Sequence, residues 1–372
     1  MTDPAASIDQ AIWARLAAAI DGGVCSAAAL AIGGPAARAR WVQGTLRTVP
    51  DDGPAISSAT RFDLASLTKP IATWAATWTA LAAGRLGLDD TAARWLPGLD
   101  PGVTVAHLVG HASGLPAHVK LYERLWAGDL GGYPDPRTAL VGLAVTTPLE
   151  RAPGTVAVYS DLGFIALAAL CERVADRPFE EVVAAALAPL ELTATGFVDL
   201  RQPGPRPAAP ATEVCPRRGL VEGEVHDENC HAGGGIAGHA GLFAPIDDVA
   251  VVAAALARAP VDGVGPIPAH LVAHAFTTSA APATSWRLGW DTPSPTPGVS
   301  HAGDAWPRTG AVGHLGFTGT SMWLDWHRGR YAVLLTNRIH PRRDRPAAAE
   351  IKALRRDVGD LAWAWLGAVD AG

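Results

Sequence analysis

Cysteine is scarce in this sequence, with four residues in 372. The four show no paired spacing, so the sequence does not indicate a disulfide framework. We therefore expect buried free thiols in a reducing compartment, and none lies in a context typical of a nucleophile. These cysteines are Cys25, Cys171, Cys215 and Cys230.

Clustered basic charge and long apolar runs are also lacking. The net charge is −6 and the basic residues are scattered, so no surface that could neutralise a phosphate backbone is indicated and nucleic acid is excluded as a partner. No run reaches about 18 uncharged apolar residues, the length typical of a membrane-spanning helix. Residues 1–9 have neither the positively charged start nor the apolar stretch that is typical of a signal peptide. We therefore expect a cytoplasmic protein without a membrane partner.

The sequence is instead rich in apolar residues, which make up 49% of a long chain and can bury a large core. Apolar residues recur every fourth position over residues 8–20, which predicts a helix. Alternating segments near both ends of the chain predict strands, and the middle has a helical pattern. The sequence predicts an α+β fold, with an antiparallel sheet built from the N- and C-terminal parts, flanking helices and a mainly helical insertion.

We expect a single domain over residues 1–372, with a sheet part at 1–85 and 213–372 and an insertion at 86–212. The proline-rich residues 201–212 suit a stiff connector between the two parts. The expected strands are residues 24–32, 38–43, 311–316, 320–326 and 331–337. The main expected helices are residues 8–20, 66–84, 105–111, 162–174, 246–258 and 347–366, together with one that Pro136 opens. Thr104 is the expected cap of the helix at 105–111.

A hydroxyl and an amine stand three residues apart at Ser66 and Lys69, a spacing that puts both on one helical face. Pro70 is tolerated only in the first turn of a helix, so we expect the helix to begin near Ser66. A serine there would meet free N–H donors, and Lys69 could take or hold its proton. The alternative is a capping serine with a surface lysine.

Two further segments hold polar side chains. Tyr159 stands at the junction of a loop and a helix that Asp161 can cap, although a lone tyrosine more often packs with its hydroxyl bonded to a carbonyl. The second segment, residues 225–241, is rich in histidine and glycine and could hold a metal. Its spacings match no zinc pattern, so we expect a cleft wall with hydrogen-bonded histidines and neither metal nor cofactor.

Taken together, Ser66-x-x-Lys69, Tyr159-Ser160-Asp161 and His314-Leu315-Gly316 resemble, in order and separation, the serine β-lactamase and penicillin-binding-protein superfamily. The closest pattern is that of its class C-like branch of serine hydrolases and esterases. Further supporting segments are residues 105–116, 189–197, 238–243 and 313–320.

The resemblance implies Ser66 as nucleophile, Lys69 as its proton partner, and Tyr159 as the base that also protonates the leaving group. It further implies an oxyanion hole from the N–H groups of Ser66 and Phe317, with His314 beside the site. An ammonium next to Tyr159 is expected to favour its phenolate.

Two residues depart from that pattern. Asp161 stands where the branch often has Asn and is expected to keep Lys69 charged, and His314 stands where β-lactamases and many peptidases have Lys. We therefore expect a serine hydrolase that forms an acyl-enzyme, acting as an esterase on small carboxylic esters.

The alternatives are a β-lactamase, a D-amino-acid peptidase or amidase, a metallohydrolase around residues 226–239, and a non-catalytic binding module with the same fold. The sequence leaves open which small-molecule ester or amide is the natural substrate. It also leaves the oligomeric state open.

Overall fold

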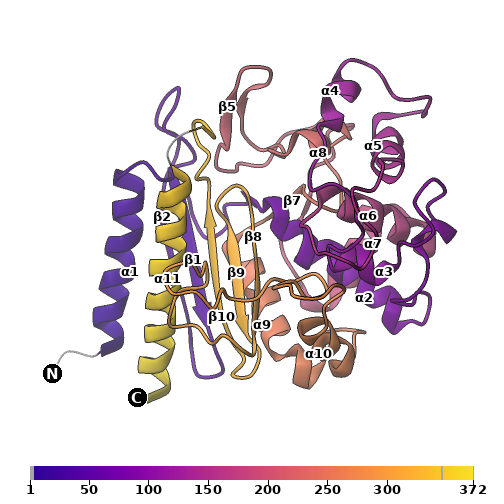
Figure 1. Cartoon of the computed structure of the whole chain (residues 1–372). Coiled ribbons are helices and arrows are strands. Elements are labelled where there is room, and N and C mark those ends of the chain that lie inside the picture. Colours follow the sequence, from indigo (N-terminus) through magenta and orange to yellow (C-terminus); the bar gives the residue numbers. More distant parts are fainter. Residues whose placement is uncertain (1–3, 345–346, 372) are drawn as a thin grey trace.

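The protein, described here from a computed structural model over residues 4–344 and 347–371, is built on a five-stranded antiparallel sheet (Figure 1). The strand order is β2-β1-β10-β9-β8, so the N-terminal hairpin pairs with the C-terminal strands. Leu30 lies opposite Trp41 on one side and Leu334 on the other. The strands are β1 (Ala27–Gly33), β2 (Arg38–Gly44), β8 (Ala311–Leu315), β9 (Ser321–Asp325) and β10 (Arg330–Thr336). The predicted α+β class is confirmed.

Helices cover both faces of this sheet. Helices α1 (Pro4–Asp21) and α11 (Ala347–Ala371) lie side by side on one face, and α9 (Ile246–Asp262) lies on the other with α10 (Ala269–Thr277) beside it (Figure 1). Successive residues of a strand point to opposite faces. Accordingly, Ala28, Leu30 and Ile32 pack into the α1 and α11 core, while Ala27, Ala29 and Ala31 pack into the larger core on the α9 side.

The larger core continues into the helical part of the chain around α2 (Trp74–Ala82). Trp74 and Trp78 of this helix are buried and stacked with ring centroids 4.8 Å apart, and Trp290 meets Trp74 edge-on at 5.9 Å. The nearly uncharged sequence of this helix therefore reflects burial on most sides. The helices α6 (Asp161–Ala175) and α7 (Phe179–Leu187) pack against it. The helical part also contains α3 (Val105–Val109), α4 (Leu121–Trp126), α5 (Pro136–Val145) and α8 (Glu228–Ala232).

Two small sheets complete the fold. The strands β3 (Phe62–Asp63), β7 (Leu242–Ala244) and β4 (Gly196–Phe197) form one, and β5 (Glu213–Cys215) and β6 (Gly219–Val221) form the other. Strand β4 lies within the predicted insertion, but it pairs with β7, which lies outside it, so this small sheet crosses the predicted boundary. The boundaries of the insertion stay a prediction. None of the helices over residues 4–344 and 347–371 has the length and apolar character needed to cross a membrane.

The expected α-helix beginning near Ser66 is wrong in detail. Residues Ala65–Leu67 form a single 3₁₀ turn, Lys69–Thr73 form a π-helical turn, and the α-helix begins only at Trp74. Pro70 supplies no N–H, so it does not support a regular α-helical ladder here. Such irregular turns occur often at functional sites.

The expected cap of the following helix is also wrong. The Ser160 hydroxyl caps α6 by accepting the Gly163 N–H at 3.2 Å, and Asp161 is the first helical residue. The carboxylate of Asp161 is drawn instead toward Lys69, 2.8 Å away. In contrast, the predicted cap at Thr104 and the predicted opening at Pro136 are confirmed, because both depend on local chemistry.

Candidate active site

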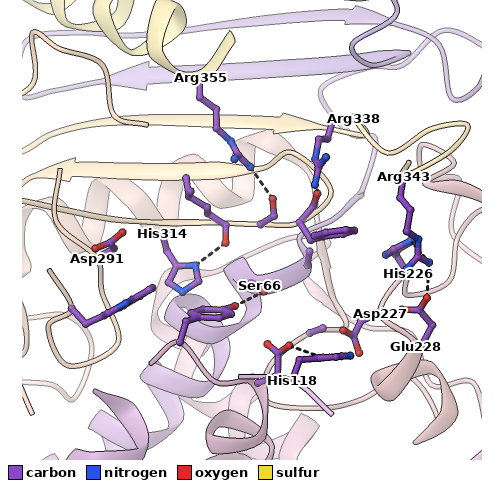
Figure 2. Close-up of a pocket in the computed structure, with 18 residues that line it drawn as sticks. Ser66, His118, His226, Asp227, Glu228, Asp291, His314, Arg338, Arg343 and Arg355 are labelled. Atoms are coloured by element: carbon purple, nitrogen blue, oxygen red, sulfur yellow. Dashed lines mark hydrogen bonds and ion pairs between the residues drawn. The ribbon is translucent and has the colours of Figure 1, made fainter. Parts of the chain in front are cut away.

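A cavity of about 570 Å³ opens beside the edge strand β8, between the sheet and the helical part of the chain. Figure 2 shows His314 and Ser66 near its centre, Arg338 and Arg355 reaching toward it from one side, and His118 and Asp227 on the other. Ser66, Tyr159, Asp161, His314, Gly316 and Phe317 all line this cavity. The fold therefore brings together three segments that are far apart in sequence.

The Ser66 hydroxyl is contacted by two polar side chains. Lys69 Nζ donates to Ser66 Oγ at 3.0 Å, and the Tyr159 hydroxyl donates to it at 2.7 Å. Lys69 Nζ also donates to Asp161 Oδ1 at 2.8 Å and to the His239 carbonyl at 3.0 Å. An ammonium has three N–H groups, so all of those on Lys69 are used.

Electrostatics keep Lys69 charged. Complete burial of its side chain is the largest single effect and opposes the ammonium, but the interactions with Asp161 and Tyr159 together outweigh it, and the pKa of Lys69 is raised above its ordinary value. Burial also opposes ionisation of Asp161, but the Lys69 charge and a hydrogen bond from His118 place the pKa of Asp161 well below its usual range. The expected charged lysine therefore agrees with the structure.

The backbone before Ser66 is held in an uncommon conformation. Ala65 has a φ of 48°, in the left-handed region that residues with a Cβ rarely adopt. The buried Asp63 carboxylate accepts the Ala65 N–H at 2.8 Å and the His226 N–H at 2.7 Å. Strained backbone of this kind persists only where its surroundings hold it, and it clusters at active sites. Asp63 thus fixes the turn that presents Ser66.

Tyr159 is packed in an aromatic cluster before α6, with His111 at 4.7 Å and Trp286 at 5.5 Å between ring centroids. Burial raises the pKa of Tyr159, and the nearby Lys69 charge lowers it by less. The ammonium favours the phenolate as expected, but burial outweighs it and the net shift of the Tyr159 pKa is upward. Tyr159 holds its proton and donates it to Ser66 Oγ.

The second oxygen of Asp161 lies 3.2 Å from His118 Nδ1. Because a carboxylate only accepts, this nitrogen carries the proton, and the hydrogen bond from His118 to Asp161 raises the pKa of His118. His118 lies 43 residues before its partner. No local sequence signal marked it, since only folding brings it to the mouth of the cavity.

His314 in the third motif is a neutral, buried imidazole. Its Nδ1 lies 2.8 Å from the Leu315 carbonyl and therefore carries the proton. Burial, together with the Lys69 charge, lowers the pKa of His314 to about 3. Its Nε2 has no partner among the described residues. This side chain thus offers the cavity a hydrogen-bond acceptor and no positive charge.

The turn after His314 needs glycine at position 316. A Cβ there would lie 1.9 Å from Thr320 Oγ1 and 2.6 Å from the Leu64 carbonyl, which is closer than atoms can approach. The next residue, Phe317, is 48% exposed, and its ring stacks on His226 with centroids 5.6 Å apart. Among the described residues, neither the Phe317 N–H nor the Ser66 N–H donates a backbone hydrogen bond. Both donors are available to a ligand oxygen.

Two of the three histidines of residues 225–241 are hydrogen-bonded to a carboxylate, whereas the third, His231, lies 3.6 Å from Glu224. His226 Nε2 lies 3.0 Å from Glu213, and His239 Nε2 lies 2.8 Å from Asp227. Within the part of the chain that the structure describes, no group of three or more His, Cys, Asp or Glu side chains converges as metal ligands would. The segment forms one wall of the cavity, as predicted.

The cysteines have no place in this site. All four are unbridged, and three of them, Cys25, Cys171 and Cys230, are buried. Burial raises the pKa of Cys171 to about 12, which disfavours a thiolate nucleophile.

The family of this chain follows from a comparison with known proteins. The model for the family described as Beta-lactamase matches residues 16–356. The chain belongs to this family. As a beta-lactamase-family protein with a serine in the nucleophile motif, it is a serine hydrolase.

Relatives of this beta-lactamase-family protein include a protein of Escherichia coli (strain K12), provisionally named as a D-alanyl-D-alanine carboxypeptidase. The two are 31% identical over 316 residues, covering 76% of this chain and 70% of that one. The corresponding protein of Salmonella typhi is 29% identical over 310 residues, with the same coverage.

Solved structures with the same fold include EstCE1, described as a hydrolase with promiscuous acyltransferase activity. Its TM-score is 0.70 at 21% identity, covering 96% of this chain and 99% of that one. A beta-lactamase/D-alanine carboxypeptidase from Pseudomonas syringae has a TM-score of 0.68 at 17% identity, covering 94% and 98%. At these identities the likeness concerns the fold.

Proposed function

We propose that this protein hydrolyses small carboxylic esters through an acyl-enzyme on Ser66. The observation that carries the proposal is the pair of donors on Ser66 Oγ, from Lys69 at 3.0 Å and Tyr159 at 2.7 Å. A hydroxyl held between an oriented cation and a phenolic oxygen that can take its proton once ionised is suited to activation as a nucleophile. The free N–H groups of Ser66 and Phe317 would hold the oxyanion of the tetrahedral intermediate.

Tyr159 is the better candidate for the base. Lys69 uses its three N–H groups on Ser66, Asp161 and His239, so as an ammonium it has no lone pair for another proton. In the reactive form Tyr159 is a phenolate beside the ammonium, takes the Ser66 proton during attack, and returns it to the leaving group. Because burial raises the pKa of Tyr159, this form is minor at pH 7 and grows with pH.

The preference for esters follows from the leaving group. An alkoxide or phenolate departs with little help, whereas an amide nitrogen must be protonated as the intermediate collapses. In this chain Asp161 holds Lys69 as an ammonium, and neutral His314 replaces the third-motif lysine. The proton relay and the fixed cation that amide substrates depend on are therefore both altered.

A second candidate is a β-lactamase or D-amino-acid peptidase. It is supported by the name of the Escherichia coli relative and by Arg338, which lines the cavity and forms no ion pair within the described part of the chain. A guanidinium in this position could bind the carboxylate that such substrates carry. A non-catalytic binding module would keep the cavity and lack turnover.

The test compares kcat/KM for p-nitrophenyl butyrate, nitrocefin and a D-alanyl-D-alanine peptide, with Ser66→Ala as control. We expect the ester to be cleaved most efficiently and the control to be inactive toward all three. A higher kcat/KM for nitrocefin or the peptide would replace the esterase proposal by the second candidate. Absence of turnover with every substrate would favour the binding module.

A further inference from the structure

The turn between β8 and β9, residues 316–320, is held by two arginines that also line the cavity. Arg355 is a buried residue of α11, and its Nη2 donates to the carbonyls of Gly316 and Thr320, both at 2.8 Å. These two residues are also joined directly, since the Gly316 N–H donates to the Thr320 carbonyl at 2.8 Å. Arg355, whose guanidinium is labelled in Figure 2, therefore closes the base of the turn.

The second arginine holds the tip of the turn. Arg338 Nε donates to the Phe317 carbonyl at 2.9 Å, and the Arg338 backbone N–H donates to the Thr318 carbonyl at 2.8 Å. The Arg338 guanidinium also lies over the Phe317 ring, 4.8 Å from its centroid. Arg338 and Arg355 thus hold the carbonyl on each side of the Phe317 N–H.

The hydrogen bond from Arg355 to the Gly316 carbonyl also fixes the orientation of the Phe317 N–H. The Gly316 carbonyl and the Phe317 N–H belong to one planar trans peptide group, so they point in opposite directions. Holding the carbonyl against Arg355 therefore fixes the N–H in the direction away from this guanidinium. A hydrogen bond from a cation to the carbonyl also polarises the peptide and strengthens its N–H as a donor.

Neither arginine is neutralised by a carboxylate. Within residues 4–344 and 347–371, no ion pair includes Arg338 or Arg355, although buried charges are normally paired. Burial, with repulsion from Arg338, lowers the pKa of Arg355 to about 9, so it stays charged at pH 7. Two positive charges therefore lie beside the peptide whose N–H would donate to the oxyanion of the substrate.

We propose that Arg355 and Arg338 are positioning residues that orient and polarise the Gly316–Phe317 peptide, so that its N–H stabilises the oxyanion. The inference rests on the proposed acyl-enzyme at Ser66 and adds residues that the family motif does not contain. A merely structural role would change stability, whereas a positioning role changes kcat and the binding of tetrahedral adducts.

The test measures kcat and KM for p-nitrophenyl butyrate and the Ki of phenylboronic acid, which forms a tetrahedral adduct with a nucleophilic serine. Removing an oxyanion donor costs about 10²–10³ in kcat. We expect Arg355→Met to lower kcat by about 10² and Arg338→Gln by about 10, with KM changed less than about threefold and the Ki raised in parallel. Arg355→Lys keeps a charged donor and should restore most of kcat.

The matched control is Arg356→Met, one residue further along α11, because Arg356 pairs at the surface with Asp357. Its kcat and Ki should match the wild type. The inference is overturned if folded Arg355→Met keeps the wild-type kcat and Ki. It is also overturned if the whole loss of kcat/KM in this variant comes from a higher KM. If Arg355→Met does not fold, folded Arg338→Gln with unchanged kcat and Ki overturns it.

Failure of the proposed function would look different. A wild type that neither cleaves the ester nor binds the boronate contradicts the acyl-enzyme, and the positioning role falls with it. An active wild type with unaffected arginine variants contradicts the positioning role alone.

Discussion

Replacing Asp161 by Asn removes the negative charge that pairs with the completely buried Lys69. The two charged atoms are 2.8 Å apart, and Asp161 is the carboxylate in contact with Lys69 among the described residues. Unit charges at that distance attract by about 6 kcal/mol at an effective dielectric constant of about 20. Desolvation offsets part of this attraction, and breaking a buried pair by removing one partner usually costs about 3–5 kcal/mol.

We expect the lower end of that range. The amide side chain of the variant would still offer an oxygen to Lys69, so Asp161→Asn should lower the free energy of unfolding by about 3 kcal/mol at pH 7. Without the counter-charge, burial lowers the pKa of Lys69 below its unfolded value of about 10.4.

The sign of the pH dependence follows from proton binding. Between the lowered folded pKa and about 10.4, the unfolded variant binds more protons than the folded one, so its stability rises with pH by up to about 1.4 kcal/mol per unit. The wild-type pKa of Lys69 is raised, so its stability gains nothing from this group over the same range. The deficit of the variant should therefore shrink between pH 7 and pH 9.

The assay is urea unfolding of both proteins at pH 7 and pH 9, followed by tryptophan fluorescence. The matched control is Asp262→Asn, which breaks the exposed Arg258–Asp262 pair and should cost less than about 1 kcal/mol at either pH. A deficit for Asp161→Asn below about 1 kcal/mol at pH 7, or one that does not change with pH, would refute the account of Lys69 as a buried ammonium held by Asp161.

Three further predictions concern catalysis. Tyr159→Phe should lower kcat by about 10²-fold or more with an unchanged circular dichroism spectrum, and near-normal turnover would move the base role to Lys69. In the wild type, kcat/KM for the ester should rise with pH from 6 to 9, because burial raises the pKa of Tyr159, and a plateau reached below pH 7 would argue against that base. His314→Lys should raise the ratio of nitrocefin to ester turnover by restoring a cation at the third motif, and an unchanged ratio would disprove its role in substrate choice.

Much of the fold could be predicted from the sequence because its signals are local. The alternation in β1 and β10 follows the two faces of the sheet, and the cap at Thr104 needs only neighbouring residues. The turn around Ser66 could not be predicted in this way. Its geometry depends on Asp63, and on contacts of Lys69 with Asp161 and the His239 carbonyl, which lie 92 and 170 residues away.

The residues of the site likewise fall into two groups, those that the sequence indicated and those that only the fold reveals. The resemblance of the three motifs to the superfamily singled out Ser66, Lys69 and Tyr159, whereas Arg355 reaches Gly316 from 39 residues away on a helix with no motif of its own. The direction of the Tyr159 pKa shift was missed because it depends on how far burial outweighs the Lys69 charge. A motif indicates some of the groups that meet, but the balance between desolvation and charge depends on their surroundings in the fold.

Covalent labelling shows whether Ser66 is the nucleophile. The protein would be treated with a fluorophosphonate, and the modified residue located by mass spectrometry of its peptides. We predict a single adduct on Ser66, slower labelling of Tyr159→Phe and no adduct on folded Ser66→Ala. An adduct on another serine, or equal labelling of Ser66→Ala, would contradict the account.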